Sequence, residues 1–204
     1  PGYGHTLGNA LRRVLLSSIP GAAITRIKIE GVVHEFATID GMREDVTELV
    51  LNLKGVRVRC NADGPITASL STYGAGCVTA AEINLPSGFD VVNQDQYLCT
   101  METDSARLEL ELTIQRGRGY LAADEHAMVP IGEIPLDAMF TPVPRVNYVV
   151  ENTRIGQATD FDRLLLEVWT DGTLKPGDAL GHAAQVLVQY SQTIADFNRL
   201  AIEP

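Results

Sequence analysis

The sequence lacks the features of membrane proteins and of disulfide-stabilised secreted proteins. No apolar run reaches the roughly 18 residues that a membrane-spanning helix needs, and no signal peptide opens the chain. Only three cysteines occur, Cys60, Cys77 and Cys99, and they are far apart, without a CxxC pair. Separated cysteines in odd number are typical of reduced thiols in a reducing compartment. We therefore expect a cytoplasmic globular protein with no membrane association.

Positive charge is also scarce. Lys and Arg number 16 against 26 Asp and Glu, which gives a net charge of -10 and an isoelectric point near 4.8. This balance argues against independent affinity for DNA, RNA or an anionic membrane. The RGRGY segment, Arg116 to Tyr120, could be an RNA-binding box, but a single copy after an alternating segment is more typical of a glycine-assisted bend. We predict no direct DNA binding.

Catalytic and metal-binding motifs are missing as well. His34 and Glu35 could begin an HExxH zinc motif, but Thr38 occupies the position of the second histidine. The other histidines and cysteines have no metal-ligand spacing, and neither GxSxG nor a P-loop is present. Asp160 and Asp162 would share one face of a strand and could bind Mg²⁺, although turn capping with a salt bridge is the more common use. We predict no catalytic residue, metal, cofactor or small-molecule substrate.

What the sequence contains is enough chain for one large domain or two small ones, since it has 204 residues of which 45% are hydrophobic. The segment from Gly2 to Gly21 predicts a helix that ends at Pro20 and Gly21. A strand is expected over 22–36, and a second helix over 43–56 with acidic residues at its start and Gly55 at its end. Short alternating runs then make 56–150 rich in strands, before a strand over 164–173 and a long helix that begins at Pro176.

The first helix has two chemically different sides. At about 100° per residue, an apolar stripe forms from Leu7, Leu11, Val14 and Leu15, whereas Leu16 lies on the opposite side, between Arg12 and Arg13. One exposed leucine is ordinary in a soluble protein. We favour the alternative that this helix packs against two different partners.

The last helix keeps one apolar face for nearly seven turns by the 3.6-residue period. Its members are Leu180, Ala183, Ala184, Leu187, Tyr190, Ile194 and Phe197. A face of this length suggests oligomerisation, commonly as a two-fold dimer, and packing beneath the chain's own sheet is the alternative. If the two terminal helices pack together, the segment between them is an insertion.

Several blocks, in order, resemble one known family. They are GYGHTLGNALRRVLLSSIPG, GVVHEF, EDVTELVLNLKG, VTAAEI, QRGRGY, PLDAMFTPV and QATDFDRLLLE, followed by TDGTLKPGDAL before the last helix. Together they cover nearly the whole chain and resemble the N-terminal domain of the alpha subunit of bacterial DNA-directed RNA polymerase. That family usually has two more strands before GYGHTLGN and a further domain after the last helix, so we expect these residues to be the interior of a longer polypeptide.

The resemblance implies an α+β fold with a discontinuous dimerisation domain, an antiparallel sheet with two helices, over 1–20 and 149–204. An inserted β-rich domain with one helix would occupy 21–148. It also implies a non-catalytic subunit that homodimerises and on which the β and β′ subunits assemble for transcription, with omega and sigma in the holoenzyme. The alternative is a free-standing nucleic-acid-binding or oligomeric interaction module.

The resemblance and the helical phase together imply two sets of site residues. The expected β-binding residues are Arg12, Arg13, Leu16, His34, Glu35, Asn52 and Lys54. The expected dimer interface comprises Leu7, Leu11, Val14, Leu15, Leu187, Tyr190, Ile194 and Phe197.

Overall fold

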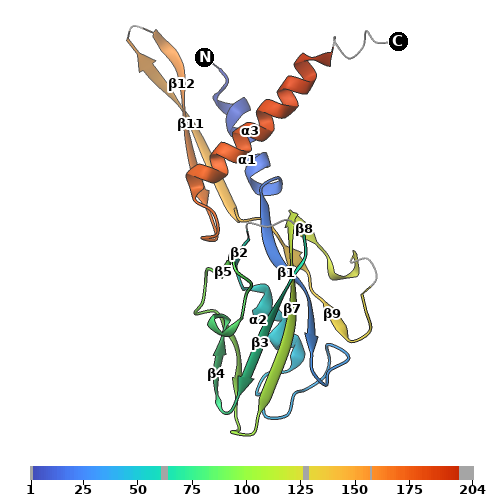
Figure 1. Cartoon of the computed structure of the whole chain (residues 1–204). Coiled ribbons are helices and arrows are strands. Elements are labelled where there is room, and N and C mark those ends of the chain that lie inside the picture. The colour runs from blue at the N-terminus through green and yellow to red at the C-terminus, as the bar shows by residue number, and fades with distance from the viewer. Residues whose placement is uncertain (1, 61–63, 126–128, 157, 198–204) are drawn as a thin grey trace, which may run out of the picture. The chain divides into compact units, whose positions relative to one another are not determined.

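The computed structural model has an α+β fold, as expected, and describes residues 2–60, 64–125, 129–156 and 158–197 (Figure 1). It divides into two compact units. Unit 1 combines Pro1–Ile19 with Thr141–Pro204, and unit 2 is the continuous segment Pro20–Phe140.

Unit 2 is built on one antiparallel sheet with the strand order β3-β7-β1-β2-β5. The strands are β1 (Pro20–Ile29), β2 (Val58–Cys60), β3 (Ile66–Tyr73), β5 (Phe89–Val91) and β7 (Arg107–Arg118). Two small pairs accompany the sheet, β4 (Gly76–Thr79) with β6 (Tyr97–Met101) and β8 (Tyr120–Leu121) with β10 (Ala138–Met139). Two short 3-10 turns, η1 (Ala80–Glu82) and η2 (Ala123–Glu125), complete the elements that the structure describes in this unit, together with β9 (Glu133–Pro135) and the helix α2.

A bulge in β1 lets this strand take two partners along the same edge. The register of β1 against β7 shifts between Ile24 and Arg26. On the other edge, β1 pairs with β2 before the bulge and with β9 after it. Thr25, at the bulge, is fully buried, and its Oγ1 donates to the carbonyl of Thr113 at 3.2 Å. Its own carbonyl accepts from the amide of Leu136, so the hydroxyl and the carbonyl at the bulge are both paired.

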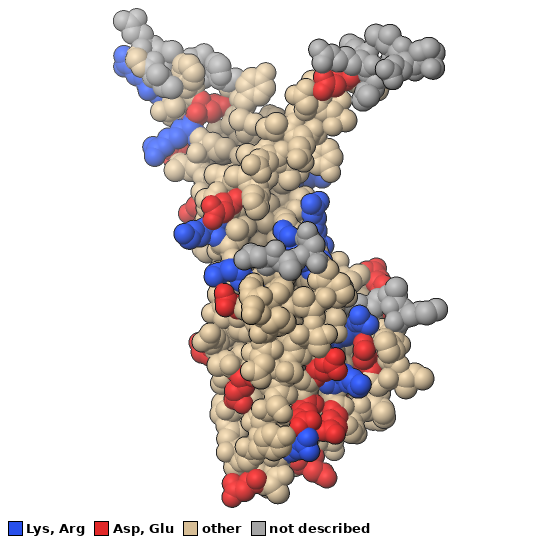
Figure 2. All heavy atoms as spheres, viewed as in Figure 1, with Lys and Arg blue, Asp and Glu red and all other residues tan. Residues whose placement is uncertain are grey.

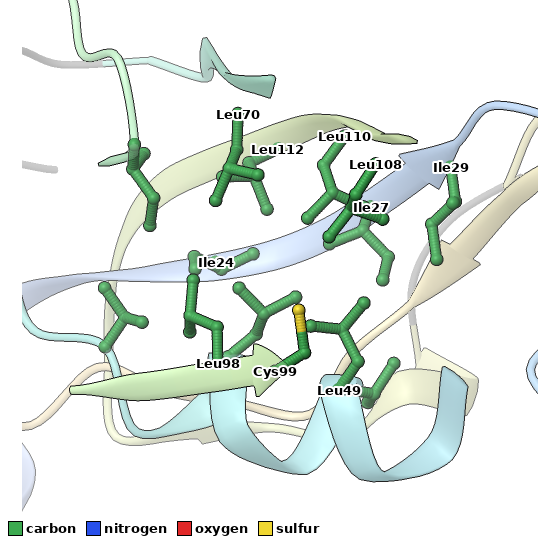
Figure 3. Close-up of a cluster of buried hydrophobic side chains, with 14 of the residues drawn as sticks. Ile24, Ile27, Ile29, Leu49, Leu70, Leu98, Cys99, Leu108, Leu110 and Leu112 are labelled. Carbon is green, nitrogen blue, oxygen red and sulfur yellow. The ribbon is translucent and has the colours of Figure 1, made fainter. Parts of the chain in front are cut away.

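The helix α2 (Val46–Lys54) is the second helix that the sequence predicts. Asp45 caps it by accepting from the amide of Glu48 at 2.7 Å, and Gly55 is its C-cap. The side of α2 that carries Leu49 and Leu53 is fully buried, because these residues fall on one face at helical spacing. In Figure 3 Leu49 faces side chains of β1, such as Ile24 and Ile27, and Leu98 of β6.

Two predicted boundaries near the start of the chain differ from the structure. The first helix, α1, spans Gly4–Ser17, and β1 already begins at Pro20. The strand expected over 22–36 ends at Ile29, since Gly31 turns the chain with a φ of +78°. The bend expected in RGRGY is confirmed, because Gly119 separates β7 from β8 with a φ of +68°.

Unit 1 consists of a long β-hairpin, a helix packed on the hairpin and a second helix packed mainly on the first. The hairpin joins β11 (Arg145–Ile155) to β12 (Ala158–Trp169), and α1 and α3 (Pro176–Ala195) are the helices (Figure 1). Pro176 occupies the first turn of α3, as predicted. The core of unit 1 is a small cluster of buried side chains from both helices, the residue pair after α1, β11 and the segment before β11: Leu15, Ile19, Val143, Val146, Ala179 and Ala183.

Glycine allows α1 to lie close against the hairpin. A Cβ added at Gly8 would lie 2.6 Å from a ring carbon of Tyr148, and one added at Gly4 would lie 2.6 Å from Val150. These distances are shorter than a van der Waals contact, so larger residues cannot occupy these positions without displacing the hairpin. Asp162 of β12 accepts from the amide of Gly4 at 2.8 Å and thereby caps α1. Capping is therefore the observed use of Asp162, while the side chain of Asp160 lies outside the described residues.

Candidate protein-interaction surfaces

The first candidate surface is the charged side of α1. Arg12 and Arg13 are both exposed, and neither forms an ion pair with a residue that the structure describes. Two adjacent guanidinium groups without a carboxylate partner leave ten N–H donors directed at solvent. This side of α1 is therefore able to bind a carboxylate-bearing partner.

Leu16, between the arginines in helical phase, is less isolated than the sequence predicts. It is half-buried and packs against the core cluster of unit 1. A helical wheel describes the helix alone, whereas the cluster that Leu16 contacts also includes Ile19 and Val143, which lie outside α1. Only part of Leu16 is left for another protein.

The apolar stripe of α1 is divided between core and surface. Leu15 is fully buried, so it belongs to the core of unit 1 and offers no surface to a second copy. Leu11 and Val14 are half-buried beside it. Leu7 is 52% exposed and remains available. The physical reason is that Gly4 and Gly8, rather than the leucines, meet the hairpin most closely.

The apolar stripe of α3 extends beyond the part of the helix that is buried. Ala179 and Ala183 have no exposed surface, but Tyr190, Ile194 and Phe197, which continue the same stripe at spacings of three, four and seven residues, are 67–76% exposed. No charged residue occurs between Ala179 and Ala195. The visible surface of this helix in Figure 2 is accordingly almost free of red and blue. Exposed apolar surface of this extent marks an interaction site.

A groove lies between α1 and α3, beside this stripe. It has a volume of about 520 Å³ and is lined mostly by apolar side chains: Leu7, Leu11, Ala184, Leu187, Val188, Ser191, Gln192 and Ala195. Three residues expected in the dimer interface, Leu7, Leu11 and Leu187, thus meet at one concave surface.

Unit 2 has a separate exposed surface around the start of α2. Val33 and Phe36 are 70% and 78% exposed, and His34 and Glu35 between them are exposed as well. The hydroxyl of Thr47, on α2, donates to the carbonyl of Glu35 at 3.0 Å and joins this segment to the helix. Leu51, one turn further along the same side of α2, is 59% exposed. We call the exposed residues of 33–36, with Thr47 and Leu51, the α2 face.

The other two expected β-binding residues use their polar groups within unit 2. The side-chain amide of Asn52 donates to the carbonyl of Leu98 at 2.8 Å. The ammonium of Lys54 lies 2.7 Å from a carboxylate oxygen of Asp137. Together with the amide of Ala123, this ion pair lowers the pKa of Asp137. Both residues therefore hold the end of α2 in place.

A buried carboxylate lies just before α2. Glu44 is 5% exposed; its Oε2 accepts from the amide of Thr100 at 2.8 Å, and its Oε1 accepts from the hydroxyl of Tyr97 and from the guanidinium of Arg43 at 2.9 Å. Burial by itself raises the pKa of Glu44, but the hydrogen bonds from Tyr97, from backbone amides and from Arg43 outweigh burial and lower it to about 2. The pKa of Tyr97 is raised by burial and by the same carboxylate.

Among the described residues, no group of His, Cys, Asp and Glu could hold a metal ion. Burial raises the pKa of the Cys99 thiol to about 12, so it is not a nucleophile at neutral pH. No described helix is both long and apolar enough to cross a membrane.

Comparison with known proteins agrees with the resemblance in the sequence. Residues 27–141 match the model of the RNA polymerase Rpb3/RpoA insert domain, which is more than half of the chain. The chain belongs to the family of bacterial RNA polymerase alpha subunits. The DNA-directed RNA polymerase subunit alpha of Roseiflexus castenholzii is 70% identical over 203 residues, which are 100% of this chain and 63% of that protein. The subunits of Herpetosiphon aurantiacus and Clostridium botulinum (strain Eklund 17B) are 65% and 48% identical, over 98% and 93% of this chain and 60% of each relative. The chain therefore spans less than two thirds of the alpha subunits that it matches.

In this member of the alpha family, sequence reasoning missed several residues that shape the surfaces. Val33, Phe36 and Leu51 were not expected to be exposed, and the local sequence carries no clear signal for it, since Val32 is buried beside the exposed Val33. Gly4 and Gly8 were missed because their role depends on the hairpin, more than a hundred residues away in sequence.

Proposed function

We propose that this chain is the assembly domain of an alpha subunit of bacterial RNA polymerase, without catalysis of its own. Two copies would pair through unit 1 and form the platform on which the β and β′ subunits assemble. The exposed apolar stripe of α3 is the observation that carries the proposal, because a partner is needed to cover it. The names of the relatives, DNA-directed RNA polymerase subunit alpha, supply the complex.

The dimer interface in this proposal consists of the α3 stripe and the groove beside it. Tyr190, Ile194 and Phe197 supply convex apolar side chains, and the groove between α1 and α3 supplies a concave apolar surface. A two-fold pair uses the same patch on both copies, so a patch that contains both shapes can be self-complementary. The absence of charge from Ala179 to Ala195 removes the desolvation penalty that charged side chains would bring.

Analytical ultracentrifugation tests the dimer. Ile194→Glu places a carboxylate in the stripe and should convert the dimer to monomer while circular dichroism stays unchanged, because Ile194 is 76% exposed in the single copy. Gln185→Glu is the matched control, since it adds the same charge to an exposed position on the opposite side of α3. A dimer that survives Ile194→Glu would contradict the assignment of this surface.

The β subunit would bind to two surfaces of the chain. The charged side of α1, with Arg12, Arg13 and the exposed part of Leu16, would accept acidic side chains, and the α2 face, with His34 and Glu35, would add apolar contact. Asn52 and Lys54 would contribute by holding the end of α2. In the second copy the same residues would lie near β′, since two identical chains meet two different partners.

Co-purification with β tests this half of the proposal. Arg13→Ala in the full-length alpha dimer should lose bound β but keep the dimer, because Arg13 is exposed and distant in helical phase from Leu7 and Leu11. Lys175→Ala, which removes an exposed cation before α3, serves as the control. If both variants retain β equally, the arginine pair is not the docking site.

The remaining parts of the proposal concern the assembled RNA polymerase, its location and its contact with DNA. Omega and sigma would join the assembled enzyme, which works in the cytoplasm on DNA held by the large subunits. The net charge of -10 supports the absence of direct DNA contact. The alternative, a nucleic-acid-binding module, would be favoured if the isolated chain retained DNA on a filter at physiological salt.

A further inference from the structure

We propose that Glu44 is a positioning residue for the α2 face: its buried carboxylate fixes the start of α2, and with it the segment 33–36, in the orientation that a docking partner requires. This inference rests on the proposed function, in which the α2 face binds β.

The segment before α2 runs along β6 and is bonded to it. The amide of Arg43 donates to the carbonyl of Thr100 at 3.0 Å, and the amide of Glu102 donates to the carbonyl of Gly41 at 2.7 Å. The Glu44 carboxylate adds two further bonds to the same strand, from the amide of Thr100 and the hydroxyl of Tyr97. The Tyr97 hydroxyl also lies 2.6 Å from the Thr100 hydroxyl, so this donor to the carboxylate is itself held in place by β6.

The fixed carboxylate determines where the α2 face lies. The residue after Glu44, Asp45, caps α2. The next amide, that of Val46, donates to the carbonyl of Ala37 at 3.2 Å, and the Thr47 hydroxyl donates to the carbonyl of Glu35. Segment 33–36 is thus bonded to the first turn of α2, which follows directly from the anchored carboxylate.

A buried carboxylate contributes little net stability to a folded protein. Charges removed from water bring a desolvation penalty, and well-packed apolar residues often stabilise a protein as much or more. Directional hydrogen bonds to a charged group instead fix geometry, because they are strong only at short distance and near-linear angle. Apolar contacts of Val46, Leu49 and Leu53 hold α2 on the core, but they are not directional and therefore constrain the orientation of its first turn less than the hydrogen bonds do.

Three variants distinguish a positioning role of Glu44 from a general effect on stability: Glu44→Gln, Tyr97→Phe and a control in the core. Glu44→Gln keeps the shape but loses the charge, and Tyr97→Phe removes one donor without touching the carboxylate. Leu70→Ala, in the buried part of β3, is the control for general destabilisation, used at a temperature where all variants are folded. The full-length alpha dimer carries each substitution, and both retention of β and amide hydrogen exchange are measured.

The positioning role predicts that Glu44→Gln and Tyr97→Phe weaken β binding by about tenfold, and that Leu70→Ala leaves it within about twofold. Exchange at the amide of Val46 should rise in the first two variants and not in the control, while dimerisation is unchanged in all three. Equal β binding by Glu44→Gln and the control, with unchanged exchange at Val46, would overturn the inference.

The proposed function and the inference fail in different ways. If wild-type dimer does not retain β, the proposed function fails, and exchange at Val46 alone decides whether Glu44 orders the α2 face. Phe36→Asp completes the set, since Phe36 is 78% exposed and its substitution should abolish β retention without changing exchange at Val46. If Phe36→Asp retains β fully, the α2 face is not the surface that Glu44 positions for β.

Discussion

The two units bury their apolar residues to different extents. Among the residues that the structure describes, the main cluster of unit 2 contains twenty-seven buried residues, whereas the cluster of unit 1 contains six, although α1, α3 and the hairpin are long elements. Many apolar residues of unit 1 that are absent from its cluster lie on the surface of α3 and in the groove beside it, and others, such as Val149 and Trp169, are exposed on the hairpin. We expect unit 2 to be stable by itself, and unit 1 to reach full stability only when a partner covers its helices.

The largest expected effect is a loss of stability in unit 1 alone, caused by one substitution in its core. Leu15→Asp places a charge in the small core of unit 1 and should destabilise that unit by several kcal/mol. Hydrogen exchange should show loss of protection in α1 and the hairpin, with protection retained in β1 and β7. Leu7→Asp is the control, since Leu7 is 52% exposed and the same change should preserve the fold. Loss of protection in both units after Leu15→Asp would show that they unfold as one.

A second effect tests whether unit 1 depends on close packing of α1 against its hairpin. Gly8→Ala would place a Cβ 2.6 Å from Tyr148 and should destabilise unit 1 by about 1–3 kcal/mol, despite the better helix propensity of alanine. Gly181→Ala on α3 meets no atom within 4 Å and should stabilise the protein by up to about 1 kcal/mol. Thermal unfolding measures both changes, and equal effects would contradict the packing argument.

The third effect concerns unit 2 at acid pH. The pKa of Glu44 is lowered from its ordinary value of 4.5 to about 2, so the ionised carboxylate stabilises the folded state. This contribution is complete above about pH 4.5 and is lost progressively as the pH falls toward 2. Urea unfolding between pH 2 and pH 7 should therefore show a steeper loss of stability below pH 4.5 in wild type than in Glu44→Gln. Parallel curves would mean that the folded and unfolded pKa values do not differ.

The smallest expected effect lies on the outer side of the unit 1 hairpin. The guanidinium of Arg145 lies 4.3 Å from the ring centre of Trp169, and Arg145→Ala should destabilise unit 1 by about 0.5–1 kcal/mol. Arg163→Ala removes the exposed ion pair between Arg163 and Glu151, whose charged groups lie 3.9 Å apart, and should destabilise unit 1 less than Arg145→Ala does. Thermal unfolding of the two variants ranks them, and a larger effect of Arg163→Ala would reverse the expected order.

Local patterns predicted the elements better than the surfaces. The helix expected over 43–56, its end at Gly55 and the strand-rich character of the segment after it agree with the structure, because neighbouring residues determine them; the helix itself is shorter, Val46–Lys54. The domain roles expected for 1–20 with 149–204, and for 21–148, stay predictions. The helical wheel of α1 correctly separated Leu15 from Arg12 and Arg13, but it placed Leu16 too far from the core, since contacts at a helix end come from several directions.

The sequence by itself determined the family, the α+β class and the two-sided character of α1, because motifs, periodicity and charge are properties of short segments. Only the tertiary structure decided which apolar residues remain outside. Ala183 and Ile194 belong to one stripe of α3, yet the first is buried and the second is 76% exposed. The reason is the finite length of the elements on which α3 packs, which no local sequence pattern can predict. The same holds for Glu44, whose role depends on β6, more than fifty residues further along the chain.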